Sequence, residues 1–191
     1  MSRTIRYAVK LSAFLTFGIL LFIIGYILFR GLPYLTQSLF SMKYTSENVS
    51  MLPSIITTVM LVFLTLLVAT PIGIFTGFYL IEYAKKGNKL VELIRIATET
   101  LSGIPSIVYG LFGMLFFVIR LGFQYSLLAG TLTAGIMILP LIIRSTEEAL
   151  LSVDDSLREA SFGLGAGKLR TIFRVVLPVA MPGILSGIIL S

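Results

Sequence analysis

The chain has 191 residues, of which 57% are apolar and only 13% are charged, and its mean hydropathy is +1.00. In soluble domains about a quarter of the residues are charged. This composition therefore excludes a disordered protein and argues against a soluble enzyme. The sequence contains no cysteine and no histidine. This excludes disulfides, a thiol nucleophile, an imidazole base and zinc sites with cysteine or histidine ligands.

Long runs without charged residues predict five membrane-spanning helices. A helix rises about 1.5 Å per residue and the hydrocarbon layer is about 30 Å thick, so about 20 residues cross it. The runs lack the alternation of barrel strands and therefore predict an all-α integral membrane protein. The predicted spans are 11–29, 55–80, 104–120, 125–143 and 175–191.

The first span is interpreted as an uncleaved anchor rather than a secretory signal. It is longer than the apolar core of a signal, and the sequence Arg30-Gly31-Leu32-Pro33 after it offers no small-x-small cleavage site. The last predicted span ends in mid-run at Ser191. We therefore expect the sequence to be part of a longer chain with at least one more span.

The positions of the basic residues predict the orientation. The N-terminal tail, the segment around 85–95 and the segment 144–174 together hold twelve Lys and Arg, whereas the two segments between them hold three. The positive-inside rule then predicts a cytoplasmic N-terminus. This asymmetry explains the net charge of +6 without nucleic acid as a partner.

Glycine pairs inside two spans indicate close helix packing. Gly73 and Gly77 follow Pro71, and the same four-residue spacing recurs at Gly183 and Gly187. An alternative interpretation is a helix that bends at Pro71 beside a transport path.

Residues 90–100 form an amphipathic pattern in which Glu92, Arg95 and Glu99 share one face. We expect a helix at the cytoplasmic interface, which the sequence Gly103-Ile104-Pro105 then breaks.

The segment 144–174 is too long for a simple turn between spans and carries charges of both signs. Ser152, Asp154 or Asp155 would cap a short helix over 156–164, acidic residues being favoured near its positive end. Gly163, Gly165 and Gly167 interrupt that helix, with Gly165 expected at positive φ. A second helix follows over 168–176 and runs to Pro178. The segment therefore predicts a compact knob, a solvated loop being the alternative.

The same glycines imitate a nucleotide-binding loop. In the run from Gly163 to Lys168 the glycine spacing is one residue short of a P-loop, and Leu169 stands where a hydroxyl is needed for magnesium. The dinucleotide fingerprint fails as well. The chain by itself is therefore not expected to bind ATP.

This knob resembles the "EAA" loop of ABC-importer permeases, whose usual form is EAA-x3-G-x9-I-x-LP. Here Ser161 replaces the second alanine and Val175 the isoleucine. The resemblance implies a type I importer permease (MetI-like) helix bundle of about six spans, five of them present, without cofactor, metal site or covalent chemistry. It also implies that the short helix is a coupling helix that docks into an ATPase subunit. The implied coupling residues are Glu159, Ala160, Ser161, Gly165, Leu177 and Pro178.

Further stretches resemble the permeases of phosphate importers, and the PstA subfamily more than its partner subfamily PstC. They are the runs 103–113, 126–133 and 139–150, and the similarity extends from Leu52 to Ser191. It implies an N-terminal region at 1–50 and a permease domain at 51–191 that contains the coupling loop 144–174. Asp154-Asp155 departs from the family's frequent proline, and Leu169 from its common aromatic residue.

The phosphate-importer resemblance also implies partners and a location. The partners are a cytoplasmic ATPase dimer, a PstC-like second permease and an extracytoplasmic phosphate-binding protein. The location is the plasma membrane of a bacterium or archaeon.

An anion path needs a cation that faces water, because a charge within the membrane is costly elsewhere. Arg144 is tied to the end of a span, with Glu147 one turn further on to orient it. These two residues are the candidate path residues, while Glu99 and Arg120 are weaker candidates. The alternative is that Arg144 only marks the cytoplasmic end of its span.

Four other interpretations of function stay open at this point. One is an ABC importer permease for another small solute, such as sulfate, molybdate or an amino acid. A secondary transporter would more often carry a charge or an unwound helix at the membrane midplane. A membrane enzyme would have only carboxylates for its chemistry, and a purely structural protein would not need the knob.

Overall fold

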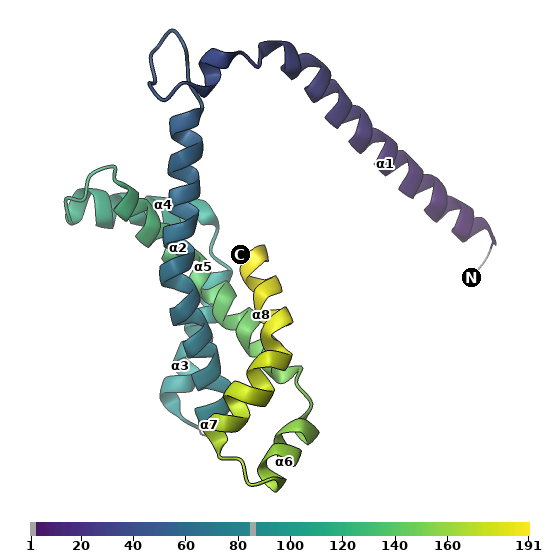
Figure 1. The fold of residues 1–191 in the computed structure, drawn as a ribbon, viewed down its shortest axis with the longest axis vertical. Helices are drawn as coiled ribbons and strands as arrows, with labels where there is room; N and C mark the ends of the chain where they lie inside the picture. Colours follow the sequence, from purple (N-terminus) through teal and green to yellow (C-terminus); the bar gives the residue numbers. More distant parts are fainter. Residues whose placement is uncertain (1–2, 85–86) are drawn as a thin grey trace. The chain divides into compact units, whose positions relative to one another are not determined.

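The computed structural model describes residues 3–84 and 87–191, and every regular element in these ranges is helical (Figure 1). By its contacts the chain divides into two compact units, Met1–Ile56 and Thr57–Ser191. Each unit is described by itself below.

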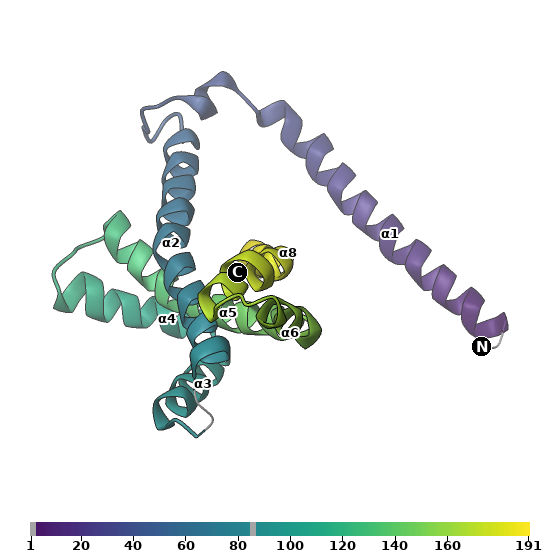
Figure 2. The same cartoon turned by 60° about the horizontal axis from the view of Figure 1, so that its bottom comes forward.

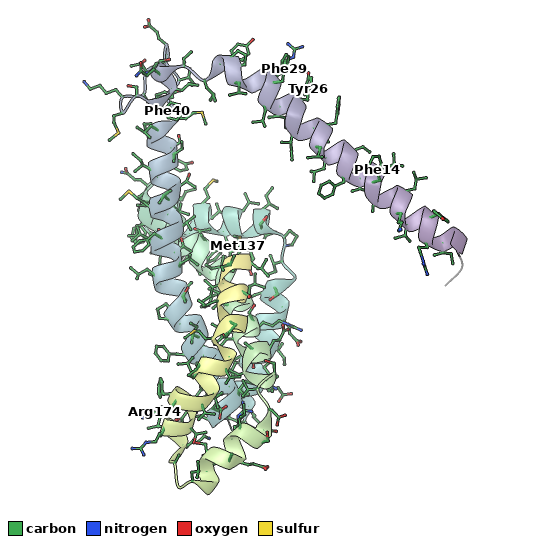
Figure 3. The ribbon with its side chains drawn as sticks, turned by 45° about the vertical axis from the view of Figure 1, so that its right-hand side comes forward. Phe14, Tyr26, Phe29, Phe40, Met137 and Arg174 are labelled. Carbon is green, nitrogen blue, oxygen red and sulfur yellow. The ribbon has the colours of Figure 1, made fainter. Side chains whose placement is uncertain are left out.

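The first unit is dominated by the helix α1, Arg3–Gly31. Its 29 residues give it a length of about 44 Å, more than the thickness of a hydrocarbon layer. Its apolar side chains are exposed all round, and Figure 3 shows Phe14, Tyr26 and Phe29 projecting from it. A helix that is apolar on every face is suited to lipid rather than water.

Two short 3₁₀ turns, Leu32–Tyr34 and Gln37–Phe40, follow α1 and lead into a loop that is closed by polar side chains. The Asn48 amide donates to the carbonyl of Lys43, and the Ser50 hydroxyl donates to the carbonyl of Leu39 at 3.1 Å. The loop therefore has an ordered hydrogen-bonded structure of its own before α2 begins at Leu52.

Within its described residues the second unit holds the rest of α2 and six further helices, and a π-helical segment directly follows α2, α4 and α7. In chain order these are α2 Leu52–Phe78 with the π segment Tyr79–Tyr83, α3 Lys89–Ser102, α4 Ser106–Gly113 with the π segment Met114–Arg120, α5 Leu127–Leu151, α6 Asp155–Gly163, α7 Lys168–Thr171 with the π segment Ile172–Val176, and α8 Leu177–Leu190.

The helix α5 packs against both α2 and α8, and all three can be followed in Figure 2. On the α2 side, a Cβ added at Gly73 would lie 2.6 Å from the Cγ2 atom of Ile142, and one at Gly77 would lie 2.7 Å from that of Thr146. Only glycine fits at such distances. The prediction that Gly73 and Gly77 serve close packing is confirmed, and α2 continues through Pro71 as a helix.

The second predicted glycine pair packs on the neighbouring face of α5. A Cβ at Gly183 would lie 2.9 Å from that of Ala149, and one at Gly187 would overlap the side chain of Ser145. Small residues thus bring the backbones of both neighbours against α5, as is common where membrane helices pack without a hydrophobic driving force.

A continuous apolar core joins the ends of α2, α5 and α8. Its buried members are Phe78, Ala149, Leu150, Val153, Ile172, Val176, Ala180 and Ile184. These residues come from segments on both sides of the predicted knob, so the knob is anchored where the three helices converge.

The helices of the first two predicted spans, Arg3–Gly31 and Leu52–Tyr83, extend beyond 11–29 and 55–80 at both ends, and the other three spans also differ from the structure. The third, 104–120, is a helix of 15 residues from Ser106 to Arg120, about 22 Å long and too short to cross alone. It passes as a span only together with α3, at a bend of 103°.

The fourth and fifth predicted spans are longer than expected. The helix α5 continues two turns beyond Arg144, because Thr146, Ala149 and Leu150 are buried against neighbouring helices. The fifth helical run begins at Lys168 rather than 175, and it passes through Pro178. The π segment before Pro178 shifts the hydrogen-bond pattern, so the missing proline N–H does not end the helix.

Candidate functional site

Charged residues from two distant segments meet at one end of the second unit. The Arg95 guanidinium lies 3.5 Å from the Glu147 carboxylate, and that of Arg144 lies 3.9 Å from Glu99. A third ion pair joins Arg158 of α6 to Glu82 at the end of α2. The segments 82–99 and 144–168 therefore lie at the same end, as the predicted topology requires of two loops on one side of a membrane.

The helix α3 is held against α5 by ion pairs and by an apolar cluster in which Val91 packs with Ile143. Its first turn is capped by Asn88, whose side-chain oxygen accepts from the N–H of Leu90 at 3.0 Å. The buried residues Val91 and Thr98 lie on the same face as Arg95, which pairs with α5. The predicted amphipathic helix is confirmed, and its charged face packs on α5 while apolar residues such as Leu93 are exposed.

The predicted pairing of Glu147 with Arg144 is wrong. Glu147 pairs with Arg95, whereas Arg144 pairs with Glu148 at 3.4 Å and with Glu99. The reason is the spacing along α5, since the i+4 residue Glu148 lies within reach of the Arg144 fork and Glu147 turns toward α3.

These ion pairs surround a small pocket. It has a volume of about 230 Å³ and is lined by Arg95, Thr98, Glu99, Arg144, Glu147, Glu148 and Leu151. Two arginines face three carboxylates there. In this conformation Arg144 pairs with Glu148 and Glu99, and about half of its side chain is exposed. The weaker candidate Arg120 is also exposed, at the end of the π segment that follows α4.

The predicted knob is present as α6, a turn and α7. Asp154, rather than Ser152 or Asp155, caps α6 by accepting from the N–H of Ser156 at 2.8 Å. The hydrogen bonds from Ser156 hold the pKa of the Asp154 carboxyl below its ordinary value. This capping role gives a physical reason for the acidic residue at a place where the family often has proline.

The turn between α6 and α7 depends on a single glycine. Gly165 has φ +81°, the left-handed region, whereas neither Gly163 nor Gly167 has a positive φ. The N–H of Gly165 donates to the carbonyl of Phe162, and that of Ala166 donates to Ser161. The positive φ predicted for Gly165 is confirmed, and only this position needs it.

The EAA-like residues separate into two groups. Glu159 and Ala160 are exposed on α6, and no residue of α6 is fully buried. Ser161 is half-buried, and its hydroxyl shares a hydrogen bond of 2.8 Å with Thr171 of α7. The serine that replaces alanine in the motif therefore braces the two helices of the knob.

The last two EAA-like residues lie beyond α7, and of the two only Pro178 is exposed. Leu177 packs against the apolar core, and Pro178 stands in the first turn of α8. These two residues belong to the attachment of the knob and not to the face that α6 presents.

Three charged residues of this site were missed by the sequence analysis. Arg158 and Lys168 lie on either side of Gly165, and both contact Glu82. Glu82 is the first charge after a run of 34 uncharged residues, and Arg158 directly precedes the EAA-like motif. Their contacts span more than 70 residues, so helical spacing carried no signal for them.

The remaining stretch that resembles a transporter signature, 103–113, forms the break before α4 and α4 itself. The Tyr109 hydroxyl donates to the carbonyl of Leu101 at 2.8 Å, across the bend. Among the described residues, no group of three or more acidic side chains is placed to hold a metal ion.

Comparison with known families decides the class of protein. Residues 69–191 match the family described as binding-protein-dependent transport system inner membrane component. The chain belongs to this family. The resemblance inferred from the EAA-like loop is thereby confirmed, and the family is one of multi-pass membrane transport permeases.

Curated relatives of this inner membrane component are transport permeases. The probable ABC transporter permease protein YqgI of Bacillus subtilis is 40% identical over 131 residues, which are 69% of this chain and 44% of the relative. The phosphate transport system permease protein PstA 1 of Mycobacterium tuberculosis is 44% identical over 123 residues, 64% of this chain and 40% of the relative. PstA of Pasteurella multocida is 35% identical over 164 residues, 85% of this chain and 58% of the relative. The chain thus spans about half the length of the curated relatives it matches.

Proposed function

We propose that this chain is a permease subunit of an ATP-driven ABC importer that moves inorganic phosphate across the plasma membrane of a bacterium or archaeon. The observation that carries the proposal is the α6–Gly165–α7 knob in a chain of the inner membrane component family. The substrate follows from the similarity to phosphate transport system permeases named PstA. These relatives do not favour the two alternative functions, a permease for another solute or a secondary transporter.

The exposed face of the knob suits docking to a cytoplasmic ATPase. Leu157, Phe162 and Leu164 are large apolar residues exposed on or next to α6, alongside the charged Glu159. Exposed apolar side chains with a charged neighbour at the end of a projecting helix are typical of an interaction surface. The proposed partners are an ATPase dimer on this face, a PstC-like second permease and an extracytoplasmic phosphate-binding protein.

Transport in this proposal requires no covalent step by the permease. The subunit alternates between two conformations, and ATP binding to the partner shifts their populations. A rigid projection is needed to convey that shift. The proposed orientation places the N-terminus, the segment 82–99 and the knob in the cytoplasm.

We propose Arg144 as the residue that contacts the anion, on the condition that its ion pairs open first. The pocket around it holds two arginines and three carboxylates, so in this conformation it does not favour an anion. Phosphate can use the Arg144 fork only after the pairs to Glu99 and Glu148 open. We therefore propose that Arg144 contacts phosphate in a second conformation of the transport cycle.

The proposal is tested with the transporter that contains this chain, purified from membranes in mild detergent with an affinity tag on the chain. An ATPase subunit is expected to co-purify, and the complex in proteoliposomes should take up phosphate only with its binding protein and ATP. Sulfate serves as the matched anion and should not be taken up. Uptake without ATP, or a preparation free of any ATPase, would contradict the proposal.

A further inference from the structure

Among the described residues, Arg158 makes the side-chain hydrogen bonds that join α6 to the ends of α2 and α5. The guanidinium of Arg158 uses all three of its nitrogens. Its Nε and Nη2 donate to Glu82 Oε1 at 3.3 and 3.2 Å, and Nη2 also donates to the Leu150 carbonyl at 2.9 Å. Its Nη1 donates to the Val153 carbonyl at 2.8 Å and to the Asp155 carboxylate at 2.9 Å. The planar fork of arginine allows these bonds to form together, which an ammonium group does not.

These bonds join three parts of the bundle. Leu150 lies in the last turn of α5, Val153 in the link to α6, and Glu82 in the π segment that ends α2. The Arg158 and Glu82 side chains are only 15% and 11% exposed, so the pair is largely removed from water. Such a pair is geometrically demanding, because each charge loses its solvation and depends on its partner.

The second helix of the knob, α7, also contacts the end of α2. Lys168, on the far side of the Gly165 turn, donates to the carbonyl of Glu82, and its ammonium lies 4.7 Å from the centroid of the Tyr83 ring. Residues of both α6 and α7 therefore bond to the end of α2. The helices α6 and α7 are also joined to each other by the hydrogen bond between the hydroxyls of Ser161 and Thr171.

Arg158 also divides α6 into two faces. It is directed into the bundle, while its neighbour Glu159 is exposed about 100° further round the helix. The exposed face of α6 thus stays free for a partner while the opposite face is bonded to α2 and α5. A movement of the exposed face would therefore be passed to the membrane helices through the hydrogen bonds of Arg158.

We infer that Arg158, held by Glu82, is the positioning residue that passes movements of α6 to the end of α2. This inference rests on the proposed function, since it assumes that an ATPase moves α6. Arg158 itself touches neither substrate nor nucleotide. Its loss should leave the ATPase bound and active while less of that activity drives transport.

The experiment compares variants of the purified transporter in proteoliposomes. The measured quantities are the amount of co-purified ATPase, the rate of ATP hydrolysis, and the uptake per ATP hydrolysed of the anion that the wild type transports. Arg158→Ala should lower uptake per ATP at least tenfold with the ATPase retained. Arg158→Lys should lower it less, because one donor group can still reach Glu82.

The pairing is tested with Glu82→Gln and with the double variant Arg158→Ala/Glu82→Gln. If the two residues act as a unit, the double variant loses no more uptake per ATP than Arg158→Ala alone. Asp155→Asn is the matched control, since Asp155 also contacts Arg158 but is 87% exposed and a surface pair contributes little. It should behave as the wild type.

Unchanged uptake per ATP in Arg158→Ala would overturn the inference. So would a parallel fall in bound ATPase, hydrolysis and uptake in both Arg158→Ala and Arg158→Lys, because that pattern indicates a role in folding alone. If the losses of uptake per ATP add up in the double variant, Arg158 and Glu82 do not act as a unit. The proposed function fails separately, in the wild type, if no ATPase co-purifies or no ATP-dependent uptake occurs.

Discussion

At the scale of single residues, the structure distinguishes glycines by what surrounds them. Gly77 faces the buried Thr146, whose Cγ2 and Cβ would lie 2.7 and 2.8 Å from an added Cβ. Gly135 lies within α5, with nothing within 4 Å of an added Cβ. The two positions therefore predict opposite responses to the same substitution.

Gly77→Ala should destabilise the protein by about 1–3 kcal/mol, because Thr146 cannot withdraw without moving α2 from α5. Gly135→Ala should be neutral or stabilising by about 0.5–1 kcal/mol, since alanine is the better helix former. Thermal unfolding in detergent measures both. Equal midpoints for the two variants would contradict the packing described for Gly77.

A second prediction concerns Arg144. If this residue contacts phosphate, Arg144→Gln should abolish uptake and Arg144→Lys should impair it, because lysine lacks the planar fork that matches phosphate oxygens. Uptake of labelled phosphate at matched protein level is the measurement. Normal uptake by Arg144→Gln would leave Arg144 as a topological marker only.

Glu148→Gln serves as the companion variant in the Arg144 experiment. It removes one of the carboxylates that pair with Arg144 and keeps the arginine. If these ion pairs must open before the anion binds, uptake in Glu148→Gln should be retained, in contrast to Arg144→Gln. Equal losses in both variants would indicate that the ion pair itself, rather than an anion contact, is what transport requires.

At the scale of elements, the knob depends on the conformation of one residue. Gly165 has φ +81° and no neighbour within 4 Å of an added Cβ, so a substitution there meets backbone strain and no steric overlap. Gly165→Val should cost about 1–2 kcal/mol in this turn, whereas asparagine tolerates the left-handed region. We expect Gly165→Val to weaken ATPase co-purification and Gly165→Asn to preserve most of it.

Gly163→Val is the control for Gly165. Gly163 ends α6 without a positive φ and also has open space around it. Co-purification of the ATPase should therefore survive this change. Equal effects at both positions would show that bulk near the docking face matters, rather than the conformation of Gly165.

The N-terminal cap of α6 predicts a dependence on pH. The hydrogen bonds from Ser156 lower the pKa of Asp154, so the charged form is favoured in the folded state. The capping contribution is then complete above the ordinary pKa of 3.8 and is lost as the pH falls through the lowered value. Hydrogen exchange of the first-turn amides of α6 should rise in Asp154→Ala at neutral pH and stay low in Asp154→Asn, which keeps an acceptor.

Several elements could be predicted from the sequence because their signals are local. The Gly165 turn, the glycine pairs and the amphipathic helix at 90–100 each depend on residues within one or two turns. The end of α5 was misplaced at Arg144, because a charge was taken as the end of a span while burial of Thr146 and Leu150 extends the helix.

The ion pairs could not be predicted in the same way. The i,i+3 spacing suggested Glu147 as the partner of Arg144, but Arg95 from a different helix takes that carboxylate. Likewise, nothing near Arg158 in the sequence indicates Glu82. Such partners are fixed by the crossing of helices, which local patterns do not contain.

At the scale of the whole molecule, the orientation is open to a direct test, since the chain has no native cysteine. Ser46→Cys and Ser156→Cys both introduce a thiol at an exposed position. With a cytoplasmic N-terminus, an impermeant maleimide should label Ser46→Cys in whole cells and Ser156→Cys only after permeabilisation. Labelling of Ser156→Cys in intact cells would invert the topology. Lys86, the other position considered for this test, lies outside the described residues.

The glycine contacts that α2 and α8 make with α5 have a consequence for which helices move. Gly73, Gly77, Gly183 and Gly187 have no rotamers to lose, so assembling α2 and α8 on α5 costs little side-chain entropy. Ion pairs of long side chains, such as those between α3 and α5, lose much more when they form. Thermal agitation should therefore open the ion pairs between α3 and α5 before it separates the three glycine-packed helices. We expect α2, α5 and α8 to travel through the transport cycle as one rigid body, with α3 as the part that swings.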